Sequence, residues 1–490
     1  MVFTSFDYLL FFLPITILVT YLCSKINHKL AIIWTIMASL FFYAFWDLSY
    51  LPILLISIFF NYVCGRIIKT TSFKKRWLAL GVSANLGLLV YFKYTNFAVN
   101  IISSIVGVNF HLQTIILPLA LSFFTFQQIS WLIDQCREDA PKCSFLEYTC
   151  AVSFFPHLIA GPIVQYHDLI PQFQNIKSFS PNWDTIAKGL FLIGCGVFKK
   201  IIIADTLSVY VNFGFDDAIT LTILQAWMTI LSYAMQIYFD FSGYCDIAIG
   251  SAYLIGIKLP DNFHSPYKSV SIREFWQRWH ITLGSFLTRY LYFPLGGSQN
   301  GMTRTCINIL IVMFLSGVWH GAGFGFILWG IAHGFAMVVQ RLWNATGRQL
   351  PKIFSQTSTF LFVAVTWVLF RATDFTSATK VYRGMLGLDG VVLPHKLKSV
   401  IPDSWNMTYV QSTAELFGTE TPIIQATWWA LLAAFACVYV LREASYLWDV
   451  CLQRQSRCVY VLSIGAAFLL LFAFVKMITV PYREFIYFNF

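Results

Sequence analysis

The chain has 490 residues, of which 58% are hydrophobic, 18% aromatic and only 11% charged. Soluble domains carry about 25% charged residues, so most of this chain cannot face water. The net charge of +10 is spread over short loops and not gathered on one domain, so no nucleic-acid partner is expected. Between these loops lie apolar runs long enough to cross a hydrocarbon core of about 30 Å. The composition therefore predicts an all-α polytopic membrane protein in contact with membrane lipids.

Five apolar segments in the first 144 residues predict membrane helices. They cover about 7–23, 30–46, 50–65, 78–93 and 112–134. The N-terminus has no basic segment or small-residue cleavage site of the kind found in signal peptides, so the first helix is expected to be retained. The stretches that follow the five helices contain two, none, five, none and two Lys or Arg residues. Positively charged loops stay in the cytoplasm, so this alternation predicts an N-terminus on the outer side.

The C-terminal helices, within 346–490, give the same orientation. Cytoplasmic loops are marked by Arg341, Arg348 and Lys352, and later by Arg442, Arg454 and Arg457. Helices are expected at about 357–373, 426–441 and 459–479. A polar segment, 374–425, is then expected outside the membrane. The C-terminus is predicted to lie on the outer side as well.

Apolar runs between about 145 and 300 are broken by Pro, Gly and charged residues. In FFPHLIAGPIVQYHDLIPQF (154–173), helices are expected to break at Pro156, Gly161, Pro162 and Pro171. Interrupted helices at membrane depth are tolerated where they are buried in protein or line a cavity. We therefore expect the working core within 145–345, as part of one membrane domain over 1–490. There is no internal repeat, which weighs modestly against a secondary transporter.

The segment Lys268–Gly297 (KSVSIREFWQRWHITLGSFLTRYLYFPLGG) combines many polar and aromatic residues. If SIREFWQRWHITLG forms one helix, four residues share a face at i, i+4, i+7 and i+11: Arg273, Gln277, His280 and Gly284. Such a helix faces an aqueous cavity or runs along the membrane surface. Two interpretations stay open for its arginines. They bind lipid headgroups, or Arg273, Arg278 and Arg289 bind a phosphorylated ligand through bidentate contacts.

A second candidate is His320, in the apolar segment GVWHGAGFGFILWGIAHG (317–334). Glycines recur every four residues beside it, at Gly317, Gly321 and Gly325, as in closely packed helices. An ionisable residue inside a membrane helix is a candidate functional residue, and a neutral imidazole there could take a proton from a hydroxyl group. The alternative is a structural histidine bonded to a neighbouring helix, which is the role expected for His333.

Two carboxylates, Asp240 and Asp246, lie in the apolar segment QIYFDFSGYCDIAIG (236–250). An unpaired carboxylate is unfavourable in hydrocarbon, so we expect both to pair with arginines or to orient a histidine. Proton or ion translocation is the rival explanation. The chain has no GxxxxGK[ST], GxSxG or HExxH motif and no CxxC pair among its eleven cysteines. No ATP-driven transport, α/β-hydrolase chemistry or metal site is therefore expected.

Four separated motifs, in order along the chain, resemble those of the membrane-bound O-acyltransferases (MBOAT). They are FPHLIAGPIVQYHDLIPQF, REFWQRWHITLG (273–284), VWHGAGFGFILWG (318–330) and the terminal FIYFNF. The resemblance runs from MVFTSFDYLLFF to the last residue. It is greatest to the bacterial branch of the alginate O-acetyltransferase membrane subunit (AlgI type), and the D-alanyl transferase of teichoic acid modification is more distant.

The resemblance implies a fold and a set of site residues. In the MBOAT fold, about 11–13 transmembrane or re-entrant helices surround a central tunnel that joins the two membrane faces. The invariant histidine of the family corresponds to His320, which would be the base, and His280 corresponds to an assisting polar group. Residues expected to bind the donor or line the tunnel are Arg273, Gln277, Arg278, Arg289, Asp240, Asp246 and Trp319.

The resemblance also implies an acetyltransferase of the bacterial inner membrane with both termini in the periplasm. Acetyl-CoA would be the cytoplasmic donor substrate, with no bound cofactor. The acetyl group would leave on the other side for an exported polysaccharide such as alginate, through a periplasmic partner protein. The competing hypotheses are a transporter or channel for a glycan or anion, an O-acyltransferase for another group such as D-alanyl, and a non-catalytic scaffold of a secretion complex.

Overall fold

The computed structural model describes residues 1–108, 114–159, 161–175, 179–399, 408–453, 458–479 and 483–486. In these ranges nearly all regular structure is helical, and the strands form one two-stranded parallel sheet. Twelve described helices have at least 16 residues when η1 and α1 are counted as one. The predicted all-helical architecture is confirmed. Arg454, Arg457 and the last four residues of the FIYFNF motif lie outside the described residues.

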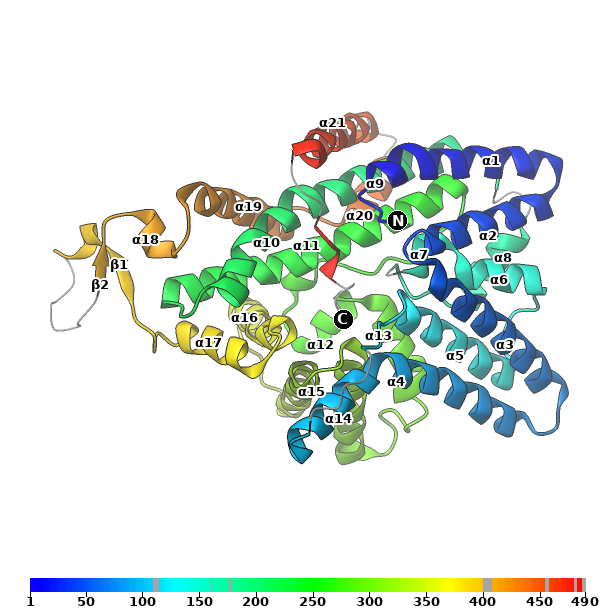
Figure 1. Ribbon diagram of the computed structural model, residues 1–490, viewed down its shortest axis with the longest axis horizontal. Coiled ribbons are helices and arrows are strands. Elements are labelled where there is room, and N and C mark those ends of the chain that lie inside the picture. Colours follow the sequence, from blue (N-terminus) through cyan, green and yellow to red (C-terminus); the bar gives the residue numbers. More distant parts are fainter. Residues whose placement is uncertain are drawn as a thin grey trace.

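The N-terminal helices form the group at the right of Figure 1. They are η1 (Asp7–Phe12), α1 (Leu13–Ile26), α2 (His28–Ala44), η2 (Leu48–Tyr50), α3 (Leu51–Thr70), α4 (Lys74–Val106) and α5 (Leu121–Arg137). The two largest differences from the predicted boundaries are at the end of α4 and the start of α5. Helix α4 continues to Val106, and Gly107, with a φ of 70°, ends it, because no Gly or Pro lies between Lys93 and Gly107. Helix α5 begins only after Pro118, and not near residue 112.

The middle of the chain contains short helices around one long one. They are α6 (Phe145–Ser153), α7 (Phe155–Leu158), α8 (Tyr166–Gln174), α9 (Trp183–Phe198), η3 (Lys199–Ala204), α10 (Asp205–Asn212), η4 (Phe213–Asp217), α11 (Ile223–Ile255), η5 (Pro266–Lys268), α12 (Ile272–Arg278), α13 (Ile281–Leu287), η6 (Thr288–Tyr292) and α14 (Gly301–His320). The predicted interruption near Pro156 and Pro162 is confirmed, with α7 ending at Leu158. The predicted break at Pro171 is wrong, because α8 continues through this residue.

The remaining elements are α15 (Phe324–Ala345), α16 (Lys352–Arg371), α17 (Phe375–Met385), β1 (Val392–Pro394), η7 (His395–Leu397), β2 (Thr408–Val410), α18 (Thr413–Phe417), α19 (Thr421–Val440), α20 (Ala444–Gln453) and α21 (Cys458–Thr479). The polar segment 374–425 is therefore not a plain loop. Its two strands and α18 lie at the left end of Figure 1, beyond the helical body.

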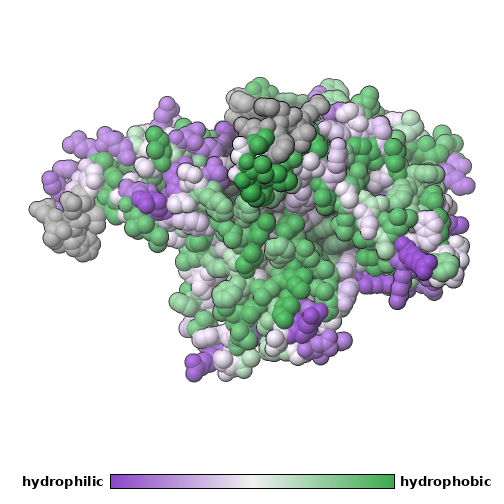
Figure 2. All heavy atoms as spheres, turned by 60° about the horizontal axis from the view of Figure 1, so that its bottom comes forward, coloured by the Kyte–Doolittle hydropathy of each residue, from purple (hydrophilic) through white to green (hydrophobic). Residues whose placement is uncertain are grey.

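Seven of the described helices are long and apolar enough to cross a membrane. They are Asp7–Ile26, Leu48–Thr70, Gly301–His320, Phe324–Ala345, Lys352–Arg371, Thr421–Val440 and Val461–Ile478. Many of their large apolar side chains are exposed, which a soluble monomer does not tolerate over so wide an area. Figure 2 shows hydrophobic side chains over much of one face, with hydrophilic residues toward its edges. The protein is thus a multi-pass membrane protein.

Glycines allow close contact between two pairs of helices at the core. A Cβ atom at Gly196 of α9 would lie 2.5 Å from the Gly243 carbonyl oxygen of α11. In the same way, a Cβ at Gly317 of α14 would lie 2.4 Å from the Phe326 carbonyl oxygen of α15. Any larger residue would push these backbones apart. Close packing beside His320 is thus achieved by Gly317, and not by a continuous face that includes Gly321.

Candidate active site

His320 is the last residue of α14, and not a residue in the middle of a helix as expected. The helix stops there because Gly321 is extended, and α15 begins only at Phe324. The His320 side chain is 4% exposed. Its ring centroid lies 5.0, 5.1 and 5.3 Å from those of Trp319, Trp329 and Phe370. The imidazole is therefore enclosed by aromatic rings at a helix end.

The C-terminus of α14 is capped by two neighbouring side chains of α4. The buried Lys93 Nζ donates to the carbonyl oxygens of Trp319 and His320, at 2.5 and 3.0 Å. The Tyr94 hydroxyl donates to the Val318 carbonyl oxygen. These donors satisfy carbonyl groups that have no partner within the helix, and the ammonium complements the negative end of the helix dipole. Lys93 and Tyr94 thereby fix the backbone that carries His320.

His280 lies at a break in the helix that the sequence predicts as continuous. Helix α12 ends at Arg278, and α13 starts at Ile281. His280 itself has φ 47° and ψ 52°, a left-handed conformation that is unfavourable by about 1–2 kcal/mol for a residue with a side chain. Tertiary backbone pairing favours the break, because Ile281 N donates to the Asn262 carbonyl oxygen at 3.0 Å. The expected common face of Arg273, Gln277, His280 and Gly284 therefore does not exist.

Asn262 orients the His280 side chain. Its Oδ1 atom lies 3.1 Å from His280 Nδ1 and also accepts bonds from Thr282 N (3.3 Å) and Thr282 Oγ1 (2.9 Å). Because an amide oxygen only accepts, the network places the proton of the neutral imidazole on Nδ1. His280 Nε2 is buried and has no hydrogen-bond partner among the described residues. A lone pair is thus held in position on this nitrogen.

Trp319 connects the two histidines. Its ring centroid lies 6.4 Å from that of His280 and 5.0 Å from that of His320. Phe126 of α5 stacks on the same indole at 5.0 Å, with an interplanar angle of 17°. Residues of α5 and α14, and the residue that precedes α13, therefore meet at one aromatic cluster. This arrangement brings together three of the residues expected at the site: His280, Trp319 and His320.

A cavity of about 940 Å³ opens beside the junction of α14 and α15. Its walls include 322–326, which follow His320 and Gly321, and 369–375 at the junction of α16 and α17. Phe370 lines this cavity and also contacts the His320 ring. The other polar lining residues include Asp205, Ser208, Asn212, Arg483 and Glu484. Phe370 thus contacts both the cavity and the imidazole, while His320 itself is not among the residues that line the cavity.

The four polar residues expected on the 273–289 segment are either exposed or paired with carboxylates. Arg273 and Gln277 are exposed. Arg278 pairs with Glu274 at 2.7 Å, and Arg289 lies 3.4 Å from Asp134 and 3.5 Å from Asp139. In this structure Arg278 and Arg289 are therefore already paired with carboxylates.

Asp240 and Asp246 pair with lysines, so the prediction of arginine or histidine partners is wrong. Asp240 lies 2.8 Å from Lys200 Nζ, and Asp246 lies 2.7 Å from Lys199 Nζ. The reason is that α9 and η3 pack along α11 and carry both lysines into the protein interior. Asp240 also accepts a bond from the Ile486 backbone N–H at 2.8 Å. Both carboxylates thus tie neighbouring segments to α11.

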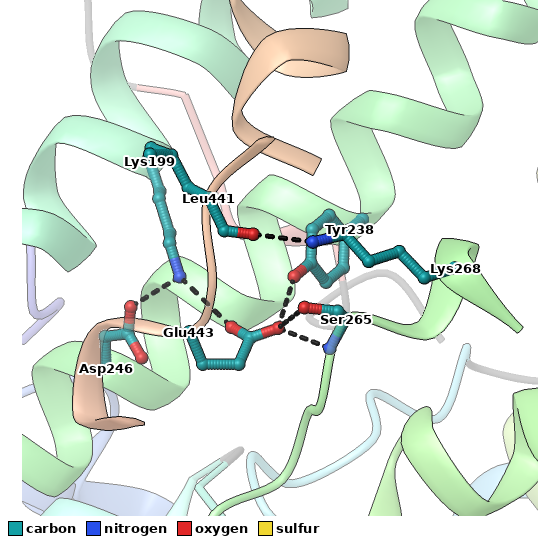
Figure 3. Close-up of polar contacts among 7 residues, drawn as sticks. All are labelled: Lys199, Tyr238, Asp246, Ser265, Lys268, Leu441 and Glu443. Atoms are coloured by element: carbon teal, nitrogen blue, oxygen red, sulfur yellow. Dashed lines mark hydrogen bonds and ion pairs between the residues drawn. The ribbon is translucent and has the colours of Figure 1, made fainter. Parts of the chain in front are cut away.

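Figure 3 shows the polar cluster around the Lys199–Asp246 pair. Glu443, at the junction of α19 and α20, lies 4.0 Å from Lys199 Nζ. Its Oε1 atom accepts bonds from the Tyr238 hydroxyl at 2.9 Å and from Ser265 N at 2.5 Å. In the same cluster, Lys268 Nζ donates to the Leu441 carbonyl oxygen at 2.7 Å. Burial lowers the pKa of the Lys268 ammonium. Glu443 thereby fixes the loop that leads from α11 to α12 and His280.

His333 has hydrogen bonds at both ring nitrogens. Trp276 Nε1 donates to Nδ1 at 3.2 Å, so Nε2 carries the proton and donates to Thr366 Oγ1 at 2.9 Å. This satisfied arrangement fits a packing role. Among the described residues, no group of three His, Cys, Asp or Glu side chains could hold a metal ion.

The sequence reasoning missed four residues that shape this region: Lys93, Asn262, Lys199 and Lys200. The three lysines carry a recognisable signal, because each interrupts an apolar run, in LLVYFKYTNF and GCGVFKKIII. A lysine in such a run must find buried acceptors or a carboxylate. Asn262 carries no comparable signal, since its role depends on contacts with residues 18 and 20 positions later in the sequence.

Comparison with known proteins identifies relatives of this chain. Residues 132–370 match the family model of MBOAT, the membrane-bound O-acyltransferase family. The chain is 40% identical over 511 residues to the peptidoglycan O-acetyltransferase of Helicobacter pylori. This alignment covers 98% of this chain and 94% of that protein. It is 39% identical over 398 residues to the probable alginate O-acetylase AlgI of Pseudomonas aeruginosa, covering 79% of this chain and 75% of that protein. It is also 27% identical over 276 residues to the teichoic acid D-alanyltransferase of Bacillus subtilis, covering 52% of this chain and 69% of that protein.

Proposed function

The chain belongs to the membrane-bound O-acyltransferase family and is an acyltransferase, and we propose that it transfers an acetyl group from cytoplasmic acetyl-CoA to a cell-envelope polysaccharide. The observation that carries the proposal is that both histidines contact Trp319, beside a cavity lined by Phe370, which contacts the His320 ring. Acetyl is favoured over D-alanyl, because the two relatives named for O-acetylation are about 40% identical and the D-alanyltransferase is 27% identical.

His320 is the proposed general base. It takes the proton from an acceptor hydroxyl as the oxygen attacks the thioester carbonyl carbon. The new C–O bond forms, the C–S bond breaks, and the proton passes from His320 to the departing CoA sulfur. No covalent acyl-enzyme intermediate is needed. The aromatic enclosure of His320 supports this role, since burial disfavours the charged form and leaves a neutral base.

His280 is the proposed assisting group. The Asn262 network leaves its Nε2 lone pair available to accept a hydrogen bond from a bound reactant or water. Trp319, which contacts both imidazoles, would separate the donor side of the tunnel from the acceptor side. For Arg273, Gln277, Arg278, Arg289, Asp240 and Asp246, the contacts described above support structural or surface roles more than contact with the acetyl group.

The proposed orientation puts both termini in the periplasm and the protein in the inner membrane. Support comes from the loop charges, with five Lys or Arg residues between 66 and 76 and none between 94 and 108. In this orientation the cavity beside His320 opens to the periplasm, because Phe97 and Asn100 of α4 line it. A polysaccharide hydroxyl, or a periplasmic partner that passes the acetyl group on, would enter there. The 98% coverage by the peptidoglycan-modifying relative makes peptidoglycan the first acceptor to test.

Purified protein in proteoliposomes tests the proposal directly. Acetyl-CoA carrying a labelled acetyl group is supplied on one side, and peptidoglycan or alginate fragments are supplied on the other. We expect release of CoA together with label on the polysaccharide. Transport of an intact glycan or anion without CoA release would instead support a transporter, and transfer of D-alanyl but not acetyl would change the assigned donor.

A further inference from the structure

A second pocket lies at the ends of α3 and α5 and the start of α6, on the side of the protein assigned to the cytoplasm. Its volume is about 490 Å³. Three of its lining residues are cations: Arg66, Lys69 and Lys142. All three are exposed, and their side chains make no hydrogen bond or ion pair with the described residues. The pocket thus presents a group of unpaired positive charges that the proposed acyl transfer does not use.

The acidic lining residue of this pocket, Glu147, is already engaged. It forms the capping box of α6, accepting a bond from Ser144 N at 2.7 Å, and it also accepts from Gln174 Nε2 at 3.1 Å. Three cations against one carboxylate leave the pocket with a net positive charge. Such a pocket is complementary to a phosphate group, which guanidinium and ammonium groups bind through charge-assisted hydrogen bonds.

An exposed apolar stripe leads along α3 to the pocket. Ile56, Phe59 and Val63 are exposed and lie on the same helical face as Arg66, at spacings of three or four residues. Phe145 at the start of α6 is exposed as well, and its ring lies 6.3 Å from that of Phe59. A phosphate in the pocket would therefore be continuous with a surface that suits hydrocarbon chains. This combination of charge and apolar surface distinguishes a phospholipid from a soluble phosphate.

We propose that the Arg66–Lys69–Lys142 pocket binds the headgroup of an anionic phospholipid of the cytoplasmic leaflet, with an acyl chain along the α3 stripe. Basic pockets between transmembrane helices on the cytoplasmic side are suited to anionic headgroups. The bound lipid joins α3 to the segment that leads from α5 to α6. The N-terminal helices are thereby held together at their cytoplasmic ends.

Lipid binding to the full-length protein in detergent tests this proposal. Native mass spectrometry compares dioleoyl phosphatidylglycerol with dioleoyl phosphatidylcholine, for wild type and for the triple variant Arg66→Gln, Lys69→Gln, Lys142→Gln. The matched control removes three exposed cytoplasmic cations outside the pocket: Lys25→Gln, Lys29→Gln and Lys75→Gln. Wild type and control are expected to prefer the anionic lipid. The triple variant is expected to bind it on the order of 100-fold more weakly. Equal binding by the triple variant and the control would overturn the proposal.

A second variant, expected to bind the lipid more strongly, keeps the test valid if the triple variant misfolds. Glu147→Gln keeps a side chain that can complete the capping box but removes the carboxylate charge, so binding of phosphatidylglycerol should become stronger. In the last part of the experiment, soluble phosphates compete with the lipid for the pocket. If inorganic phosphate or CoA displaces the lipid at equal concentration, the pocket is a site for a soluble phosphate and the proposal is wrong. If the lipid tests fail, the proposal of acetyl transfer still stands, so the two proposals are tested separately.

Discussion

Asn262 accepts the Nδ1–H of His280 and thereby leaves the Nε2 atom of this imidazole as a proton acceptor. The two residues are 18 positions apart and are held together by backbone pairing between 262–264 and 278–281. In the proposed reaction Asn262 is therefore a positioning residue. It does not have to contact a reactant in order to affect the reaction.

Asn262→Ala is expected to lower kcat for acetyl transfer by about 10-fold to 100-fold, because the imidazole loses the acceptor that fixes its tautomer. KM for acetyl-CoA should change little. Asn262→Asp keeps an acceptor for both His280 and Thr282, so it is expected to retain more activity than the alanine variant. Steady-state kinetics on both variants check this. Wild-type kcat in the alanine variant would show that the orientation of His280 is unimportant.

Lys93→Met is expected to reduce the free energy of unfolding by about 1–3 kcal/mol, since the Trp319 and His320 carbonyl groups lose a buried donor. The transfer rate should fall as well, because the end of α14 carries His320. Thermal unfolding in detergent and CoA release measure the two effects. Lys75→Met, an exposed change on the same helix, should alter neither. If both variants behave alike, Lys93 does not support the site.

The Lys199–Asp246 pair is expected to show strong coupling. Either Lys199→Met or Asp246→Asn leaves a charge without its partner in the interior, which is unfavourable by about 3–5 kcal/mol. The loss of stability in the double variant should therefore be smaller than the sum of the losses in the two single variants. A double-mutant cycle on melting temperatures measures this coupling. Additive losses of stability would mean that Lys199 and Asp246 do not interact energetically.

The exposed pair Lys74–Glu138, with an N–O distance of 2.5 Å, is the matched control for this cycle. The ammonium beside Glu138 lowers the pKa of that carboxyl group. Solvent screens the pair, so Glu138→Gln should leave the melting temperature nearly unchanged.

Hydrophobicity and loop charge were enough to predict the multi-pass helical architecture, because membrane helices need long apolar runs whatever their neighbours are. Boundaries were predicted well where a strong local signal exists, as at the C-terminal end of α19. They were wrong where the signal is indirect. Helix α4 extends past the expected end near residue 93, because polar residues such as Asn96 do not stop a helix.

The break at His280 could not be predicted from the local sequence. REFWQRWHITLG contains no proline and no glycine before Gly284, and a left-handed histidine is locally unfavourable. Pairing with 262–264 outweighs that preference and is visible only in three dimensions. The lysine partners of Asp240 and Asp246 were missed for the same reason, since they come from a different helix. The identification of His280 and His320 came from motif resemblance more than from spacing.

Single-turnover release of CoA by His320→Ala tests the central claim most directly. Wild-type protein and the His395→Ala control, which alters an exposed histidine away from the segments that hold His280, are mixed with labelled acetyl-CoA and acceptor under identical conditions. Melting temperature and gel filtration confirm that each variant is folded. If His320 is the base, its loss lowers the rate of transfer by about 100-fold to 10,000-fold while the control remains active. A folded His320→Ala protein that transfers acetyl at the wild-type rate would contradict the assignment.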